Sequence, residues 1–222
     1  AGQSRYVCCA SVNNVMEAFD SAEFREAMRQ ADLVTPDGMP LVWGLRLLGA
    51  GRASRVYGPD LTLHVLEGAA QAGLPVGFHG ASPETLDRLI ERVRKRFPAL
   101  RITYACAPPF RPLTEAEDAQ VTENVRASGT RILFVGLSTP KQERWMAAHK
   151  DRVPAVMLGV GAAFDFLSGT KPQAPRWMQK SGLEWLFRCL SEPRRLGPRY
   201  LRNNPRFVTL FAMQLLGFRV PR

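Results

Sequence analysis

The feature that most constrains the fold is a repeated alternation of short apolar runs and longer amphipathic segments. Arg131–Gly136 (RILFVG) and Ala155–Gly159 (AVMLG) are continuous apolar runs, which is typical of strands buried on both faces. Between such runs the apolar residues recur at helical spacing, for example at Leu86, Leu89, Ile90, Val93 and Phe97. Because parallel strands need helical crossovers, this alternation predicts an α/β fold, a mostly parallel sheet with helices on both faces.

The remaining elements follow from the same periodicities and from capping signals. We expect further strands at Tyr6–Ala10, Ala31–Val34, Leu74–His79 and Arg101–Ala105, and further helices at Val12–Gln30, Pro40–Leu48 and Asp60–Ala72. Ser82 should cap a helix that has Pro83 at its first position, and the TEAE segment from Thr114 to Glu117 is a capping box. Ligands of parallel sheets bind beyond the carboxyl ends of the strands, so the loops there are the places to look for a site.

Positive charge is concentrated in one part of the chain. Residues 171–222 contain eleven Lys and Arg but two acids, while the preceding 170 residues are nearly neutral and the total is +10. We therefore predict a catalytic domain over residues 1–180 and a basic, amphipathic appendage over residues 181–222. Such an appendage indicates an anionic partner: phosphates, nucleic acid or a membrane surface.

An apolar run, Phe207–Phe218, lies within this appendage and has only 12 residues, whereas a bilayer-spanning helix needs about 20. Because Arg206 and Arg219 flank it, the run fits either a helix in a membrane interface or one that packs back on the domain. We expect neither a spanning helix nor a signal peptide.

Cysteine and histidine placement argues for a reduced protein without a metal centre. The cysteines lack C-x-x-C spacing and are expected to be free thiols in the cytoplasm: Cys8, Cys9, Cys106 and Cys189. The histidines are far apart in the sequence and are expected to have loop or packing roles: His64, His79 and His149. There is also no D-x-D pair, the device by which many sugar-nucleotide enzymes hold a divalent metal.

Asp37 lies in the segment VTPDGMPLVWG, between an expected strand and an apolar helix. Asp before Gly is a common turn signal, because Asp bonds its own backbone and Gly accepts a positive φ. By local statistics the turn role is therefore favoured, and the alternative is a catalytic carboxylate held at a loop tip.

Two strand-following loops have features that suit a nucleotide. The first is GLSTPKQE, from Gly136 to Glu143, which enters a helix through Pro140 and would place Lys141 and Gln142 near unpaired N–H groups. It is not a Walker A loop, and an ordinary strand–helix turn capped by Ser138 or Thr139 explains it equally well. The second, GVGAAFD from Gly159 to Asp165, combines small residues with an acid but lacks the GxGxxG fingerprint.

The basic appendage places arginines at near-helical offsets. If the segment is helical, with Pro193 as a break or a first-turn residue, one face would present Arg188, Arg195, Arg199 and Arg202. Arginine can contact diphosphate oxygens at two points, while the alternative is a solvated basic face.

Four motifs in order resemble one family. DGMPLVWGLRLLG, GLSTPKQERW, GVGAAFDFLSG and LEWLFRCLSEPRRL together are similar to the WecG/TagA/CpsF family of bacterial glycosyltransferases, over about Tyr6 to Phe207. The resemblance implies a Rossmann-like fold and inverting transfer of an N-acetylmannosamine-type sugar from UDP to an undecaprenyl-diphosphate-linked acceptor. It implies no metal or other cofactor, with the UDP-sugar as donor substrate, and a protein peripheral on the inner face of the cell membrane. The polymer made would be a cell-surface polysaccharide or wall polymer.

The resemblance also assigns residues. It implies that Asp37 is the general base, that Gln142 belongs to the catalytic set, and that Arg188 and Arg195 stabilise the UDP leaving group. Further contacts to substrate are expected from Cys9, Ser11, Asn13, Gly80, Gly136, Pro140, Lys141, Glu143, Gly161, Phe164, Asp165 and Arg199.

One departure from the family pattern lies just after the first strand. Members usually carry a T-x-N or similar pair there, whereas this chain has Cys9 and Ser11, with Asn13 and Asn14 beyond. Serine has one hydroxyl where asparagine has an acceptor and two donors. A changed substrate preference, compensation by Asn13, and weak activity are all open from the sequence.

Three other functions can be compared with the sequence. A dehydrogenase would need GxGxxG after the first strand, where this chain reads CCASVNN. A nucleic-acid-binding module fits the aromatics Trp177, Trp185 and Tyr200 but leaves the earlier motifs unexplained, so we expect no nucleic-acid partner. A family member with reduced or lost activity that binds lipid or a partner is the main alternative. Whether the chain forms a homo-oligomer is open.

Overall fold

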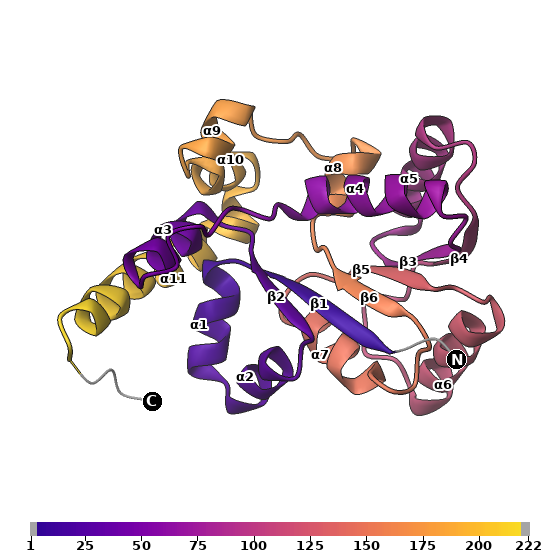
Figure 1. Cartoon of the computed structure of the whole chain (residues 1–222), viewed down its shortest axis with the longest axis horizontal. Helices are drawn as coiled ribbons and strands as arrows, with labels where there is room; N and C mark the ends of the chain where they lie inside the picture. The colour runs from indigo at the N-terminus through magenta and orange to yellow at the C-terminus, as the bar shows by residue number, and fades with distance from the viewer. Residues whose placement is uncertain (1–3, 219–222) are drawn as a thin grey trace. The chain divides into compact units, whose positions relative to one another are not determined.

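The computed structural model describes residues 4–218 (Figure 1). The chain divides into two compact units. We call the first the sheet unit; it contains residues up to 9, 27–34 and 58–172. We call the second the helical unit; it contains residues 10–26, 35–57 and those from 173 onward. The predicted boundary at residue 180 stays a prediction.

Six parallel strands form the sheet, in the order β2-β1-β6-β5-β3-β4. They are β1 (Arg5–Ala10), β2 (Leu33–Pro36), β3 (Val76–Gly80), β4 (Ile102–Cys106), β5 (Ile132–Gly136) and β6 (Val156–Gly159). The two most apolar runs of the sequence are β5 and β6, which pair at the centre with Phe134 opposite Leu158. This arrangement confirms the predicted α/β fold.

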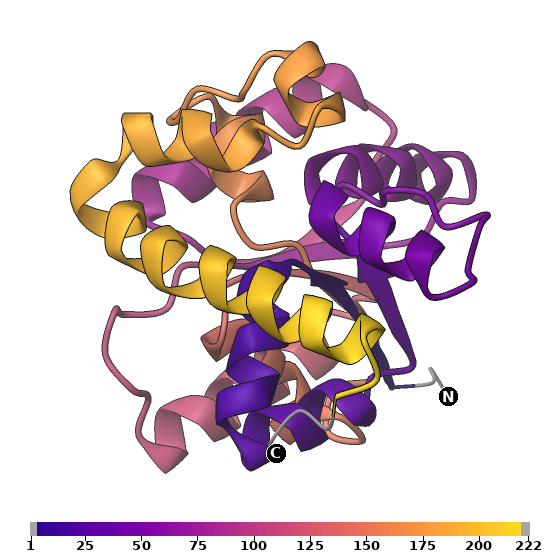
Figure 2. The same cartoon turned by 90° about the vertical axis from the view of Figure 1, so that its left-hand side faces the viewer.

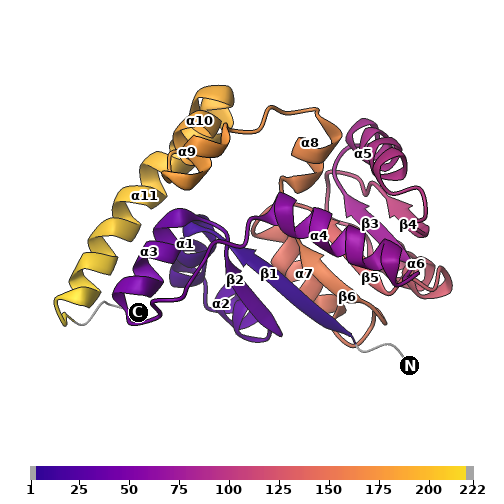
Figure 3. The same ribbon diagram turned by 45° about the horizontal axis from the view of Figure 1, so that its top comes forward.

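Alternate residues of the strands build a core on each face of the sheet. One face is covered by α4 (Gly58–Gln71), α5 (Pro83–Arg96) and α8 (Ala163–Ser168), as Figure 3 shows. The side chains of Phe78, Phe134 and Leu158 pack with these helices. The Phe78 and Phe134 rings stack with centroids 5.4 Å apart. On the other face, Leu133, Val135 and Met157 pack with α6 (Glu115–Ala127) and α7 (Lys141–His149). Burial on both faces explains why the strands are continuously apolar.

The predicted capping signals are confirmed. The Ser82 hydroxyl accepts a hydrogen bond from the Thr85 N–H (3.2 Å) at the start of α5. Thr114 and Glu117 form the reciprocal capping box at the start of α6.

The single helix expected over Val12–Gln30 was wrong. The structure has two helices there, α1 (Val12–Asp20) and α2 (Ala22–Arg29), separated by Ser21 in an extended conformation. The hydroxyl of Ser21 accepts a hydrogen bond from the Phe24 N–H (3.2 Å), so it caps the second helix and favours the break.

The helical unit contains α1, α3 (Met39–Leu47), α9 (Arg176–Lys180), α10 (Glu184–Ser191) and α11 (Pro193–Leu215). Pro193 lies in the first turn of α11, as the sequence allowed. In Figure 2 the yellow α11 crosses the indigo α1, and the contacts between these two helices agree with that view.

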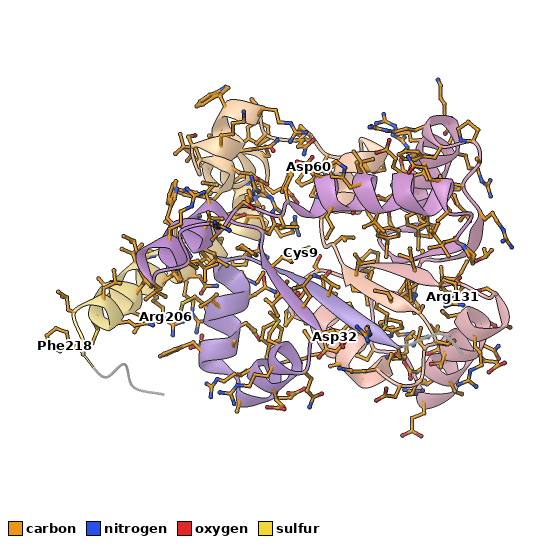
Figure 4. All side chains as sticks on the ribbon, viewed as in Figure 1. Cys9, Asp32, Asp60, Arg131, Arg206 and Phe218 are labelled. Atoms are coloured by element: carbon orange, nitrogen blue, oxygen red, sulfur yellow. The ribbon has the colours of Figure 1, made fainter. Side chains whose placement is uncertain are left out.

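Polar bonds and one close packing contact hold α11 in place within its unit. The Asn203 amide donates to Asn13 Oδ1 (2.9 Å), and Arg206, labelled in Figure 4, makes a two-point contact with Asp20 of α1 (2.9 and 2.7 Å). The Phe211 ring packs on Gly44 of α3. Phe211 of the apolar run therefore packs within the unit, whereas Val208, Leu215, Leu216 and Phe218 are exposed, so both alternatives for this run stay open. Arg219 lies outside the described residues. No helix within residues 4–218 is long and apolar enough to cross a membrane.

Candidate active site

Asp37 occupies a corner that is fixed on both sides. It follows the last residue of β2 and precedes α3, whose N-cap is Gly38, and its N–H donates to the Ala10 carbonyl at the end of β1 (2.8 Å). Gly38 has a φ of −89° and a ψ of 138°, an extended conformation, so the positive φ expected of the glycine in this turn was wrong. The side chain remains 24% exposed, so the carboxylate is held firmly but is open to a ligand.

Arg55 holds Asp37 from the segment between α3 and α4. Its Nε donates to the Asp37 carbonyl, and its Nη2 lies 3.2 Å from Asp37 Oδ1. The same Nη2 lies 2.5 Å from Oε2 of Glu184, and the guanidinium carbon sits 4.1 Å from the centroid of the Tyr57 ring. One arginine therefore bridges two carboxylates, and neither it nor Glu184 was identified from the sequence.

Glu184 stands at the start of α10 and is almost fully buried. Its Oε1 accepts a hydrogen bond from the Tyr57 hydroxyl (3.2 Å), which in turn accepts one from Gln173 Nε2 (3.1 Å). Asp37, Arg55, Tyr57 and Glu184 thus form one bonded cluster, which we call the Asp37 cluster. All four belong to the helical unit.

The cluster makes Asp37 a stronger proton acceptor than an ordinary aspartate. Burial raises its pKa to about 6, and the negative charge of Glu184 acts in the same direction, while Arg55 and Arg188 act against it. A carboxylate with this pKa is still ionised at neutral pH, yet it binds a proton far more readily than one with a pKa near 4. That combination suits a general base.

Three of the four predicted arginines, Arg188, Arg195 and Arg199, influence one another electrostatically. Arg188 lies one turn after Glu184 on α10, and its charge lowers the pKa of Asp37. Burial, together with the charges of Arg188 and Arg195, lowers the pKa of Arg199. The Nε of Arg199 is buried and receives no hydrogen-bond partner from residues 4–218. Arg202 instead lies 3.9 Å from Asp20.

Like charges held together repel one another, so Arg188, Arg195 and Arg199 favour an anion between them. Arg195 already has a partner, because it makes a two-point contact with Glu192 (2.6 and 2.7 Å). A diphosphate accepts several such contacts, and the predicted role of these three arginines toward it stays a prediction.

The residues after β1 have structural partners. Ser11 precedes α1, and both its N–H and its hydroxyl lie within hydrogen-bond distance of Asn14 Oδ1 (3.0 and 2.9 Å). Asn13 accepts the bond from Asn203 described above, and Cys9 is buried at the end of β1. Their predicted contacts to substrate stay predictions.

In the sheet unit, Gln142 links two strand-following loops. Its Oε1 accepts a hydrogen bond from the Gly161 N–H (3.0 Å), and its Nε2 donates to Oε1 of the buried Glu143 (2.9 Å). The Thr139 hydroxyl donates to the same oxygen (2.9 Å). Pro140, rather than Ser138 or Thr139, occupies the N-cap position of α7, and Lys141 is exposed at its first turn.

Close packing accounts for Gly80 and Gly136, two of the glycines that the sequence singled out, whereas Gly161 has a φ of +54° and room for a Cβ. Gly80 of β3 pairs with Gly136 of β5, and a Cβ on Gly80 would lie 2.6 Å from the Gly136 carbonyl. A Cβ on Gly136 would lie 2.7 Å from the ring of Phe164, which is in the core. Asp165 pairs with Lys171 (3.0 Å). Their roles toward a ligand stay predictions.

Within the described part of the chain, no group of three or more His, Cys, Asp or Glu side chains is placed to hold a metal ion.

Comparison with known proteins gives the class of enzyme. The sequence model described as "Glycosyl transferase WecG/TagA/CpsF family" matches residues 1–220. A protein of Bacillus spizizenii named N-acetylglucosaminyldiphosphoundecaprenol N-acetyl-beta-D-mannosaminyltransferase is 30% identical over 205 residues, covering 92% of this chain and 77% of the relative. With its α/β fold and the motifs of Asp37, Gln142 and the arginines, the chain belongs to the WecG/TagA/CpsF family and is a glycosyltransferase.

Proposed function

We propose that this enzyme transfers an N-acetylmannosamine-type sugar from UDP to an undecaprenyl-diphosphate-linked acceptor, with inversion at the anomeric carbon. The name of the Bacillus relative supports this choice of sugar and acceptor. The observation that carries the proposal is the Asp37 cluster, which provides a partly exposed carboxylate with a pKa of about 6. The product would enter a cell-surface polysaccharide or wall polymer.

In the proposed reaction, Asp37 takes the proton of the acceptor hydroxyl while that oxygen bonds to the anomeric carbon of the donor sugar. The bond from this carbon to the β-phosphate oxygen breaks on the opposite face, so a single displacement inverts the centre. One carboxylate is enough, because the leaving diphosphate needs no proton. The charge that develops on UDP would be met by Arg188, Arg195 and Arg199.

Gln142 has a separate role in the proposal. By accepting the Gly161 N–H and donating to Glu143, it fixes the loops that follow β5 and β6, where ligands of parallel sheets bind. We propose that Gln142 acts by keeping the shape of these loops.

The test is a UDP-release assay with a panel of UDP-N-acetylhexosamines and a short-chain lipid-diphosphate acceptor. Asp37→Asn should lower turnover by about two to four orders of magnitude, the usual contribution of a general base. Asp87→Asn, which changes an exposed aspartate of α5, is the matched control and should leave turnover unchanged. Near-normal turnover of Asp37→Asn would return Asp37 to a turn role. If none of the donors in the panel yields UDP, the result would favour the alternative of a family member that binds lipid or a partner.

We also propose that the helical unit docks on the inner surface of the cell membrane. Supporting features are the positive charge of residues 171–222 and the exposed apolar side chains of α11 and its end: Leu201, Val208, Leu215, Leu216 and Phe218. The test is co-sedimentation with vesicles containing anionic phospholipid. Leu215→Glu combined with Leu216→Glu should reduce both vesicle binding and transfer to a lipid-linked acceptor, while transfer to a water-soluble analogue is retained. Unchanged vesicle binding would contradict docking through α11.

A further inference from the structure

We propose that Glu184 is a positioning residue for the base, because it holds Arg55 so that one carboxylate oxygen of Asp37 stays open for the acceptor hydroxyl. This inference rests on the proposed role of Asp37. It assigns a function to a buried acid of α10 that has no part in the proton transfer itself.

The contacts of Arg55 are unequal. Its Nη2 lies 2.5 Å from Glu184 Oε2 but 3.2 Å from Asp37 Oδ1. Because charge-assisted hydrogen bonds strengthen as they shorten, Glu184 is the principal partner of this nitrogen. Asp37 is held by the longer Oδ1 contact and by its own backbone carbonyl, and no hydrogen bond from residues 4–218 reaches its Oδ2.

Without the Glu184 charge, Arg55 would be expected to turn fully toward Asp37. Arginine and carboxylate groups commonly form two parallel hydrogen bonds, a geometry that would occupy both oxygens of Asp37. Neither oxygen of Asp37 would then be open to the acceptor hydroxyl, and the pKa of Asp37 would be lower. Glu184 prevents this by competing for the same guanidinium nitrogen.

Glu184 is itself fixed in place. It lies in the first turn of α10, where the helix dipole favours a negative charge, and it accepts the Tyr57 hydroxyl (3.2 Å). Just before it, Gly182 has a φ of +74° and lies against Trp43 of α3, where a Cβ would come within 2.6 Å of the ring. This close approach sets where α10 begins and therefore where Glu184 points.

The charged and titratable groups that face Asp37 come from two segments. Arg55 and Tyr57 lie between α3 and α4, and Glu184 and Arg188 lie on α10. The negative charge of Glu184 raises the pKa of Asp37, whereas both arginines lower it. Removing the Glu184 charge therefore leaves Asp37 facing two cations, and its pKa should fall.

The experiment measures the ionisation of Asp37 directly, by following its side-chain carboxyl carbon by NMR as the pH changes, in the full chain. In the unmodified protein we expect a midpoint near pH 6, and in Glu184→Gln a midpoint at least one unit lower. The acid limb of the kcat/KM profile should move by the same amount, and kcat on its plateau should fall at least tenfold. Glu184→Asp, which retains the charge, should restore most of both quantities.

Two further variants sharpen the test. Tyr57→Phe removes the hydroxyl that holds Glu184 and should shift the Asp37 midpoint in the same direction by a smaller amount. Glu117→Gln breaks a different acid–arginine pair, with Arg111 in the sheet unit, and should move neither the midpoint nor the profile. It controls for the general effect of losing one negative charge.

An unchanged Asp37 midpoint in folded Glu184→Gln would overturn the inference, even if activity fell, because a merely structural role lowers activity without moving the titration. If Glu184→Gln does not fold, the Tyr57→Phe midpoint decides: a downward shift supports the inference and none overturns it. Failure of the proposed function has a different signature, in which Asp37→Asn keeps its activity while the Asp37 midpoint still shifts in Glu184→Gln.

Discussion

Replacing His79 should remove a large acid sensitivity from the stability of the protein. His79 lies on β3 with no exposed surface. Its Nδ1 is 3.3 Å from the Tyr104 hydroxyl, and its ring stacks on Trp145, which stacks in turn on His149. Burial, aided by the nearby His149, lowers the pKa of His79 to about 4.

The size of the effect follows from the difference between the two pKa values of this one group. In the unfolded chain His79 binds a proton below about pH 6.5, but in the folded protein only below about 4. Between these values the unfolded state holds the extra proton, so the free energy of unfolding falls as the pH falls. At about 1.36 kcal/mol per pKa unit, the loss is about 2 kcal/mol at pH 5 and about 3 kcal/mol at pH 4.

The measurement compares urea unfolding of the unmodified protein and His79→Gln at pH 7 and pH 5. His79→Gln should be less stable at pH 7 because the ring stack is lost, but the gap should narrow by about 2 kcal/mol at pH 5. Asp37 has the opposite effect, because its raised pKa stabilises the folded state as the pH falls. This contribution to the free energy of unfolding is the same in both proteins and therefore cancels in the comparison. His64→Gln, at an exposed position of α4, is the matched control and should keep a constant gap. A constant gap for His79→Gln as well would refute the reasoning.

Four other substitutions test the fold of the sheet unit. Gly80 has a φ of +127°, and the Cβ of Gly80→Ala would lie against a backbone carbonyl, so this variant should lower the free energy of unfolding by at least about 3 kcal/mol. Gly129 has a φ of +68° but faces open space, so Gly129→Ala should lower it by only about 1–2 kcal/mol. Urea unfolding measures both. Gln142→Ala leaves the Gly161 N–H unpaired and should lower stability by about 1–3 kcal/mol as well as transfer; lost transfer with an unchanged Tm would mean that Gln142 acts on the substrate alone. Ser82→Ala removes the cap of α5 and should lower the free energy of unfolding by about 1 kcal/mol in the same assay. An unchanged free energy of unfolding would show that this cap does not stabilise the protein.

Local signals were enough to predict the sheet and the helix starts. The strands β5 and β6 were evident because a strand buried on both faces must be apolar throughout, and Ser82 and Thr114 mark helix starts through bonds to residues three positions away. The break between α1 and α2 also has a local signal, the cap at Ser21, but the apolar periodicity continues across this residue and therefore indicated one helix.

The partners of Asp37 could not be predicted in the same way. Arg55 and Glu184 are 129 residues apart, and neither lies in a segment whose local pattern indicates a contact. The one available hint was that Glu184 is one of only two acids in a strongly basic segment, where an unneeded negative charge is unexpected. His79 and His149 likewise have no sequence relation, and only the packing on Trp145 brings them together.

The separation of Arg55 from Glu184 also has a consequence for biosynthesis. The helical unit is built from three stretches of chain, and the last of them supplies Glu184 and Arg188. At 5–20 residues per second, a ribosome needs about 6–26 s to pass from Arg55 to Glu184, a stretch of 129 residues. During this interval residues 58–172, the last and longest stretch of the sheet unit, are synthesised, while Glu184 and Arg188, the other charged groups that act on Asp37, do not yet exist. The surroundings of Asp37 are therefore completed late in translation, and a nascent chain halted before residue 173 would carry the aspartate without the acid that we infer keeps one of its oxygens open.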